Sequence, residues 1–247
     1  MIVEDWIRRQ LIERQLPLGR SPVMFQRWSH LLFLHWPIEP EKIQRTLPAG
    51  LQVDTFADRG WIGIVPLFMR DVRPAGLPSV LGLSNFLELN LRTYVRDREG
   101  RPGVWFYSLD ANQPLAVWIA RLCFALPYQH ATMRANIEGG EIAYSSLRIG
   151  AAETLHYCYC PSAELEEAGL GSLDFFLLER YRLFARRGGR LMTGRVYHAP
   201  YRLGKVIVRE LDTRLFKLDG FEMPTESPAH AAYVRRADVT VYPIETA

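Results

Sequence analysis

The sequence predicts an α+β protein whose sheet is mainly antiparallel. Short segments that alternate apolar and polar residues recur along the chain, and about four helical segments are interleaved with them. With 247 residues, 48% of them hydrophobic, the chain is long enough for one large β-rich domain or two small ones. No internal repeat or low-complexity segment divides the chain. We therefore expect short strands to build most of the fold.

The chain opens with a pattern typical of a short amphipathic helix, over residues 3–15, which would dock on the body or on a partner subunit. Its apolar positions at helical spacing are Val3, Trp6, Ile7 and Leu11. Residues 16–22 contain Pro and Gly and end the helix. We expect residues 1–22 to form a helix and linker, and residues 23–247 to form a single domain.

Strand patterns dominate the rest of the chain, bounded by Pro, Gly, Asn or Asp. The expected strands are 27–36, 51–56, 61–72, 86–96, 103–110, 128–137, 141–149, 154–160, 190–198, 203–211 and 231–242. Prolines bound two expected helices, 39–47 and 112–124. A third, 172–186, starts with Ser172 as its cap, and its apolar residues occupy most of the circumference. We expect this helix to be packed on the sheet.

Strand 86–96 carries the most informative pattern. Its apolar face holds Leu87, Leu89, Leu91, Thr93 and Val95, and its other face holds Glu88, Asn90, Arg92, Tyr94 and Arg96. Such a row of carboxylate, amide, guanidinium and phenol groups can hold a small polar molecule. Alternatively, the row faces water, as one side of an antiparallel sheet often does. A long apolar loop, 73–84, precedes the strand, and loops of that kind often cover a binding site.

The charge balance gives little support for nucleic-acid binding. The net charge is +3, and 27 of the 30 basic residues are Arg. Residues 1–15 mix acidic and basic side chains with apolar ones, unlike a signal peptide, and no apolar run reaches membrane-spanning length. Three Cys do not form a disulfide framework in a chain of this length. We expect a cytoplasmic protein without a nucleic-acid or membrane partner.

Cofactor motifs are absent from the sequence. There is no phosphate-binding loop, no Gly-x-Gly-x-x-Gly after a strand and no Gly-x-Ser-x-Gly elbow. His156, Cys158 and Cys160 share one strand face and are zinc-competent types, but a second ligand pair is missing. We expect neither a metal nor a cofactor.

Five long segments together resemble one family. They are 24–56, 61–69, 82–96, 103–133 and 172–185. The chain resembles the YqjF-like proteins of the DUF2071 family, which is in turn similar in fold to acetoacetate decarboxylase. The resemblance covers most of residues 24–220. It implies a curved, largely antiparallel sheet that closes into a barrel-like cone around a small-molecule cavity, with helices packed against it.

The resemblance to the decarboxylase implies site positions one by one. Arg27 falls where that family has an arginine early in its first strand, and Glu88 matches its site glutamate. Where the decarboxylase has a Schiff-base lysine after a proline, Pro127 is followed by Tyr128 and Gln129. Because a phenol cannot form an imine, we expect no Schiff-base decarboxylation here. The cavity itself is expected to be retained.

The expected cavity wall consists of Arg27, Glu88, Tyr128 and His130. Glu88 would act as general acid or base with a raised pKa, or alternatively would pair with an arginine. Arg27 would clamp a carboxylate, or alternatively would form a salt bridge to Glu88. Tyr128 would donate to a carbonyl or enolate oxygen, or alternatively would only fill the lysine's place. His130 would be a base or donor, or alternatively a hydrogen-bonded core residue.

Two further residues are candidates for substrate binding. Arg92 shares the polar face with Glu88 and would extend the cavity wall or lie outside it. Asp110 ends a strand and would serve the site or cap the following helix.

The expected function is binding of a small oxo- or carboxylate-bearing molecule. If the protein is an enzyme, the sequence favours a cofactor-free lyase, hydratase or isomerase, with Glu88 as the acid–base group. The alternatives are a non-catalytic ligand-binding module, for which the missing lysine argues, and an interaction module that uses the N-terminal helix and the loop 73–84. A homo-oligomer remains open.

Overall fold

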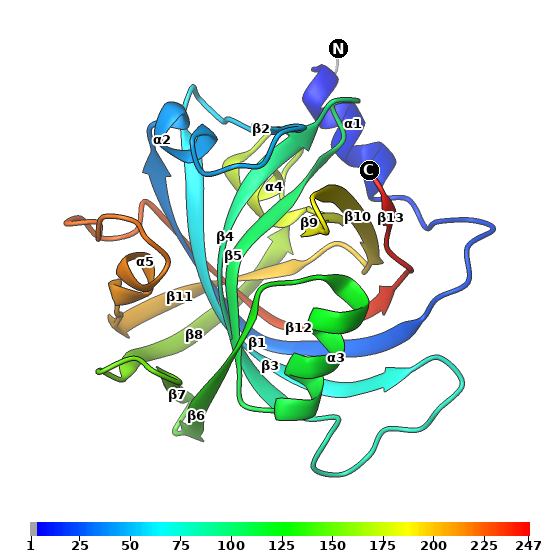
Figure 1. Cartoon of the computed structure of the whole chain (residues 1–247). Coiled ribbons are helices and arrows are strands. Elements are labelled where there is room, and N and C mark those ends of the chain that lie inside the picture. Colours follow the sequence, from blue (N-terminus) through cyan, green and yellow to red (C-terminus); the bar gives the residue numbers. More distant parts are fainter. Residues whose placement is uncertain (1–3) are drawn as a thin grey trace.

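The computed structural model describes residues 4–247, the side chains of 163–165 excepted, and over this range the chain forms one curved sheet with helices packed against it (Figure 1). The strands are β1 (Met24–Ile38), β2 (Leu51–Val53), β3 (Gly60–Pro74), β4 (Phe86–Asp97), β5 (Pro102–Ala111), β6 (Tyr128–Glu138), β7 (Glu141–Arg148), β8 (Leu155–Glu167), β9 (Arg182–Arg187), β10 (Arg190–Tyr197), β11 (Arg202–Glu210), β12 (His230–Val241) and β13 (Glu245–Thr246). The helices are α1 (Asp5–Glu13), α2 (Pro40–Gln44), α3 (Pro114–Phe124), α4 (Leu173–Leu178) and α5 (Arg214–Leu218).

The sheet closes on itself in two rings that share strands. The first runs from β5 through β6, β7, β8, β11, β12, β1, β3 and β4 back to β5. The second uses β12, β1, β3, β4 and β5 again and closes through β9 and β10. Within the described residues, the β5–β6 and β5–β9 pairs are parallel and the other pairs are antiparallel. The expected α+β fold with a mainly antiparallel sheet is therefore confirmed.

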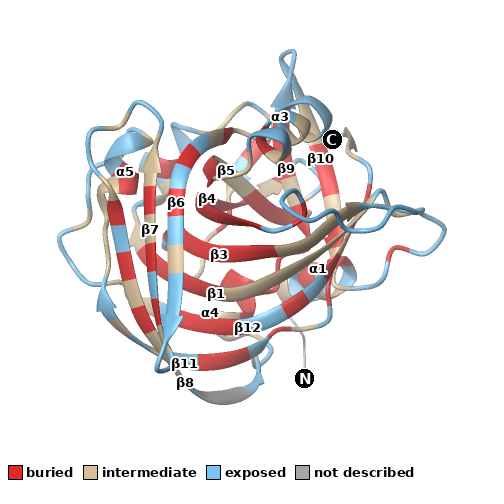
Figure 2. Cartoon of the chain, turned by 90° about the horizontal axis from the view of Figure 1, so that it is seen from below, coloured by how far each residue is buried: buried red, intermediate tan, exposed pale blue. Residues whose placement is uncertain are grey.

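Each ring encloses its own apolar core, so the shared strands are buried on both faces. Leu89 and Leu91 of β4 pack in the first core with residues of β6, β7, β8 and α5. Phe86 and Tyr94 of the same strand pack in the second core with residues of β10 and α4. Figure 2 shows buried residues along β1, β3 and β4. The polar row of β4 from Glu88 to Tyr94 therefore faces the interior of the second ring, and for these residues the interpretation that the row faces water is wrong.

A bulge in β1 decides which of its residues face the second core. His30 has a φ of 51°, in the left-handed region, and the register between β1 and β3 shifts after Ser29. Beyond the bulge, Leu31 and Phe33 belong to the second core. Because side chains alternate along a strand and an extra residue reverses the alternation, Trp28, and not Arg27, packs against the same core before the bulge.

The N-terminal helix α1 docks on the body of its own chain. The Trp6 ring lies 5.9 Å from the Phe176 ring of α4, and Gln10 Nε2 donates to the Glu179 carbonyl over 2.8 Å. The buried Glu13 carboxylate receives Arg182 Nη2 at 2.9 Å. These contacts pack α1 against α4 and the start of β9.

The expected helix 172–186 is wrong in its second half. The helix α4 ends at Leu178, and the chain continues as β9, which pairs with both β10 and β5. Phe184 of β9 packs so closely on Gly103 of β5 that a Cβ at Gly103 would lie 2.7 Å from its ring. Pairing on both edges outweighs the helical propensity of this segment. The short helix α5 was not expected.

Candidate functional site

The inner face of β4 lines a cavity in the second ring. The cavity has a volume of about 100 Å³, and Glu88, Asn90 and Arg92 lie side by side on its wall. Most of the remaining wall is apolar and includes Trp28, Leu31, Val65, Leu67, Phe106 and Leu109. The polar row thus enters a largely apolar enclosure. A carboxyl in such a place is poorly solvated.

The connection between β5 and β6 brings Tyr128 to Glu88. The helix α3 crosses over and returns the chain as β6, parallel to β5, with Tyr128 opposite Leu109 and Leu109 opposite Asn90. Tyr128 Oη donates to Glu88 Oε2 over 2.5 Å, and Asn90 Nδ2 donates to Glu88 Oε1 over 3.2 Å. The Glu88 side chain is only 5% exposed. The carboxylate therefore has a donor on each oxygen.

Burial dominates the ionisation of this pair. Desolvation raises the pKa of Glu88, and the hydrogen bonds from Tyr128 and Asn90 and the charge of Arg92 oppose that shift. Burial, followed by the neighbouring Glu88 charge, raises the pKa of Tyr128 well above that of a free phenol. Tyr128 therefore keeps its proton, while Glu88 exchanges its proton at a higher pH than an exposed glutamate does.

Three of the residues that line the cavity each have one buried polar atom without a hydrogen-bond partner among the described residues. These atoms are Asn90 Oδ1, Arg92 Nε and Arg180 Nη2. Arg180 is held in place by Asp54, whose Oδ2 lies 2.7 Å from Nη1, and by the Phe176 carbonyl. Because buried polar groups are nearly always paired, two free donors and one free acceptor around one cavity indicate a place for a polar ligand.

A second, larger chamber adjoins the cavity. Its volume is about 410 Å³, and it lies between α3 and the loop 73–84, on the side of the molecule where both are visible in Figure 1. Five residues line both spaces: Gln26, Met69, Phe124, Leu126 and Tyr128. From the loop, Leu77, Val80 and Leu83 contribute to the chamber wall. The loop thus forms part of the wall of the space that adjoins the Glu88 cavity.

Two residues expected in the cavity wall lie elsewhere. Arg27 points away from the cavity, and its Nη1 and Nε pair with Asp71 and Asp238 at 2.5 and 3.0 Å. The reversed alternation before the β1 bulge explains this placement, and Gln26 and Trp28 take the inner positions. His130 is exposed on β6 and does not line the cavity. Neither residue contacts Glu88, so both placements correct the expectation.

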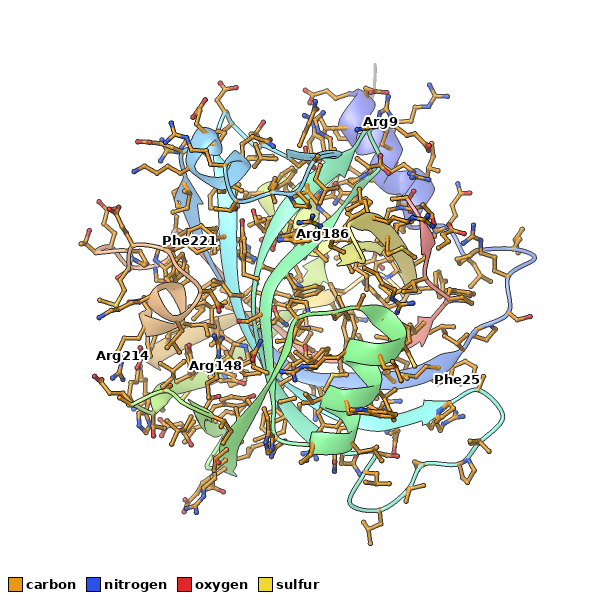
Figure 3. The ribbon with its side chains drawn as sticks, in the orientation of Figure 1. Arg9, Phe25, Arg148, Arg186, Arg214 and Phe221 are labelled. Carbon is orange, nitrogen blue, oxygen red and sulfur yellow. The ribbon has the colours of Figure 1, made fainter. Side chains whose placement is uncertain are left out.

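Asp110 belongs to a different cluster, on the first-ring face of β5. Its carboxylate is fully buried and accepts from Arg148 Nε at 2.9 Å. Arg148 Nη1 also donates to Asp219 at 2.7 Å, and Nη2 donates to Ser108 Oγ at 2.7 Å. Figure 3 shows Arg148 on the opposite side of α3 from Phe25, which lies near the start of β1. Asp110 neither lines the cavity nor caps α3, since Gln113 accepts from Leu115 N there.

The ionisation of Asp110 reflects this setting. Burial raises its pKa to about 7, the nearby Asp219 and Glu88 charges add to the shift, and Arg148 opposes it. Raised pKa values occur in structural ion-pair networks as well as in active sites.

Sequence patterns missed several members of the cavity wall, among them Arg180 and Gln26. Arg180 lay inside the segment expected to be helical, where no face could be assigned to it. Gln26 is one position away from Arg27, and only the bulge at His30 reveals its orientation. Asn90 and Arg92 were visible in the polar row of strand 86–96.

No lysine lines either space. Lys42, Lys205 and Lys217 are the three lysines of the chain, and all are exposed. Among the side chains that the structure describes, no three of His, Cys, Asp or Glu are grouped closely enough to hold a metal ion. None of the helices in the described range has the length and hydropathy that crossing a membrane requires.

Comparisons of fold place this architecture among known enzymes. The acetoacetate decarboxylase of Legionella pneumophila superposes with a TM-score of 0.64, covering 96% of this chain and 94% of that one at 12% identity. The enduracididine biosynthesis enzyme MppR complexed with pyruvate superposes with a TM-score of 0.63, covering 93% and 92% at 12% identity. At such identities the likeness concerns the fold alone.

Comparisons of sequence identify the family. The uncharacterized protein YqjF of Bacillus subtilis (strain 168) is 34% identical over 223 residues, which are 90% of this chain and 91% of that protein. The model of the family DUF2071, described as an uncharacterized conserved protein, matches residues 25–238. The chain therefore belongs to the DUF2071 family.

Proposed function

We propose that the cavity binds a small oxo- or carboxylate-bearing molecule and that Glu88 and Tyr128 move a proton on it without a cofactor. The observation that carries this proposal is the 2.5 Å hydrogen bond between Tyr128 Oη and Glu88 Oε2 on the wall of a largely apolar cavity. A base and a proton donor that touch each other in a poorly solvated site fit a lyase, hydratase or isomerase.

Each group has a role that its chemistry allows. Arg92 and Arg180 line the cavity, each has a guanidinium nitrogen without a hydrogen-bond partner among the described residues, and they would hold a carboxylate or carbonyl oxygen. The Glu88 carboxylate would take a proton from the carbon beside the carbonyl, leaving an enolate. Tyr128, whose raised pKa keeps it protonated, would turn its single O–H from Glu88 to the enolate oxygen once the ligand is bound. Replacement of the Glu88 proton from solvent, followed by its delivery from Glu88 to carbon, completes the exchange.

The comparisons support the ligand class. MppR, which shares the fold, is described in complex with pyruvate, a small oxo acid. The exposed positions of Lys42, Lys205 and Lys217 support proton transfer without an imine, because a Schiff base requires an amine in the cavity.

The exchange of the methyl protons of pyruvate in heavy water, followed by proton NMR, tests the proposal. Wild type should accelerate the exchange, and Glu88→Gln should lower the rate by roughly 10²- to 10⁴-fold, as loss of an acid–base group does. Glu88→Gln should still bind pyruvate. Glu138→Gln, which changes an exposed carboxylate on β6, is the matched control and should exchange at the wild-type rate. Full exchange activity in Glu88→Gln would overturn the proposal.

A non-catalytic binding module is the second candidate, and the lack of a lysine in the cavity wall favours it. It predicts saturable binding of pyruvate with no proton exchange in wild type, and unchanged binding after Tyr128→Phe. An interaction module would use the N-terminal helix and the loop 73–84; α1 packs on its own chain through Glu13 and Gln10, and its Ile12 stays exposed.

A further inference from the structure

We infer that the ligand is amphipathic, with its polar head at Glu88 and an unbranched apolar tail in the chamber between α3 and the loop 73–84. This inference rests on the proposed function and names the ligand class of the same site. The head would be an oxo acid, and the tail would be an aliphatic chain.

The first support is the continuity of the two spaces. Gln26, Met69, Phe124, Leu126 and Tyr128 line both the cavity and the chamber. A molecule whose oxygen atoms meet Tyr128 and Glu88 therefore has its far end directed along a shared wall toward α3. The chamber is about four times larger than the cavity, at about 410 Å³ against about 100 Å³.

The second support is that the chamber offers nothing to a polar group. No charged side chain is among the described residues that line it. Its polar side chains are already engaged: Ser84 Oγ accepts from Val80 N at 2.8 Å, and Gln113 Nε2 donates to the Gly82 carbonyl at 2.6 Å. Gln26 Oε1 likewise accepts from Trp28 Nε1 at 2.8 Å.

The cavity at Glu88 shows the opposite pattern. There, Asn90 Oδ1, Arg92 Nε and Arg180 Nη2 lack partners among the described residues. Asn90 is 4% exposed and Arg180 is 6% exposed, so water does not readily satisfy them. One end of the joined space thus requires hydrogen bonds from its occupant, and the other end offers only apolar contact.

The volume sets the length of the tail. At roughly 30 Å³ for a water-sized group, the chamber accommodates on the order of ten such groups. A methylene is close to that size, so a medium-length chain fits the chamber, whereas pyruvate leaves it empty.

A chain-length series tests the inference by calorimetric titration of the full chain with pyruvate, 2-oxohexanoate, 2-oxooctanoate and 2-oxodecanoate. The Kd should fall about three- to fourfold per added methylene. This corresponds to a gain of about 0.8 kcal/mol in binding free energy for each CH₂ that is buried. The gain should stop once the tail fills the chamber. A flat series in which pyruvate binds as well as the longer acids would overturn the amphipathic ligand and leave the proposed function intact.

Two substitutions on one face of α3 locate the tail. Ala116 and Ala120 both line the chamber. Ala120→Phe should remove most of the gain in affinity that the longer acids show, while pyruvate binds with an unchanged Kd. Ala116→Phe gives an independent test if the first variant has a lowered Tm. The matched control is Leu122→Phe, on the exposed side of the same helix. In this variant, the Kd should fall with chain length as steeply as in wild type. If the Kd falls with chain length as steeply in both Ala variants as in wild type, the tail does not lie in the chamber. If none of the acids binds wild type, both this inference and the proposed function are overturned.

Discussion

Two buried polar clusters lie on neighbouring strands, and they differ in how fully their atoms are paired. In the Arg148 cluster, all three guanidinium nitrogens donate to Asp110, Asp219 or Ser108. In the cavity cluster, Glu88 is paired, but Asn90 and Arg92 each keep an atom without a partner among the described residues. A cluster in which every guanidinium nitrogen is hydrogen-bonded, here called the saturated cluster, indicates a structural role. Polar atoms without hydrogen-bond partners beside a cavity indicate a place for a ligand.

The largest expected effect breaks the saturated cluster. Arg148→Met leaves Asp110 and Asp219 buried without their cation, so the free energy of unfolding should fall by about 3 to 5 kcal/mol. Urea unfolding followed by circular dichroism measures this loss. Arg134→Met, which changes an exposed arginine on β6, is the control and should alter stability by no more than about 0.5 kcal/mol. A loss in Arg148→Met as small as that of the control would show that the cluster is not structural.

A smaller effect appears as a pH dependence of stability. Asp110 has a pKa of about 7 in the folded protein, above the value of 3.8 for a free side chain. Between these values the unfolded chain loses this proton while the folded protein retains it. Stability contributed by the protonated carboxyl is therefore present at low pH and lost as the pH rises through about 7.

Asp110→Asn removes this titration. Relative to the variant, wild type should lose about 2 kcal/mol between about pH 5 and about pH 7, at 1.36 kcal/mol per pKa unit. Urea unfolding of both proteins across that range gives the difference. A constant difference at every pH would mean that Asp110 is ionised throughout.

The smallest expected effect on stability comes from the cavity cluster. Burial raises the pKa of Glu88, so its ionised form is less favourable in the folded protein than in the unfolded chain. Glu88→Gln keeps the acceptor for Tyr128, and the free energy of unfolding should stay within about 1 kcal/mol of wild type or rise slightly. A loss as large as that of Arg148→Met would remove the contrast between the clusters.

Strand 86–96 illustrates what the sequence could predict. Its alternation places Glu88, Asn90 and Arg92 on one face, as observed. The pattern does not reveal that this face is covered, because β9, β10 and α4 come from far along the chain. The family resemblance supplied the closeness of Glu88 and Tyr128, which are separated by a helical crossover.

The placements of Arg27 and Asp110 depended on information that local patterns lack. A single left-handed residue, His30, reverses the alternation of β1 and moves Arg27 to the outer face. The partners of Asp110 lie on β7 and just after α5, so no local spacing could indicate the Arg148 cluster. The prediction of a helix over 172–186 was wrong in its second half, because strand pairing of β9 on two edges overrides the local helix propensity.

The pairing of β1 with β12 has a consequence for how the protein is made. Met24 lies opposite Val241, so the two rings share a seam that joins segments about two hundred residues apart in sequence. Neither ring can close until β12 has left the ribosome, and the apolar strands β1, β3 and β4 remain exposed until then. Completion of the fold thus requires residues 230–241, and a chain truncated before residue 230 would present open sheet edges to chaperones and proteases.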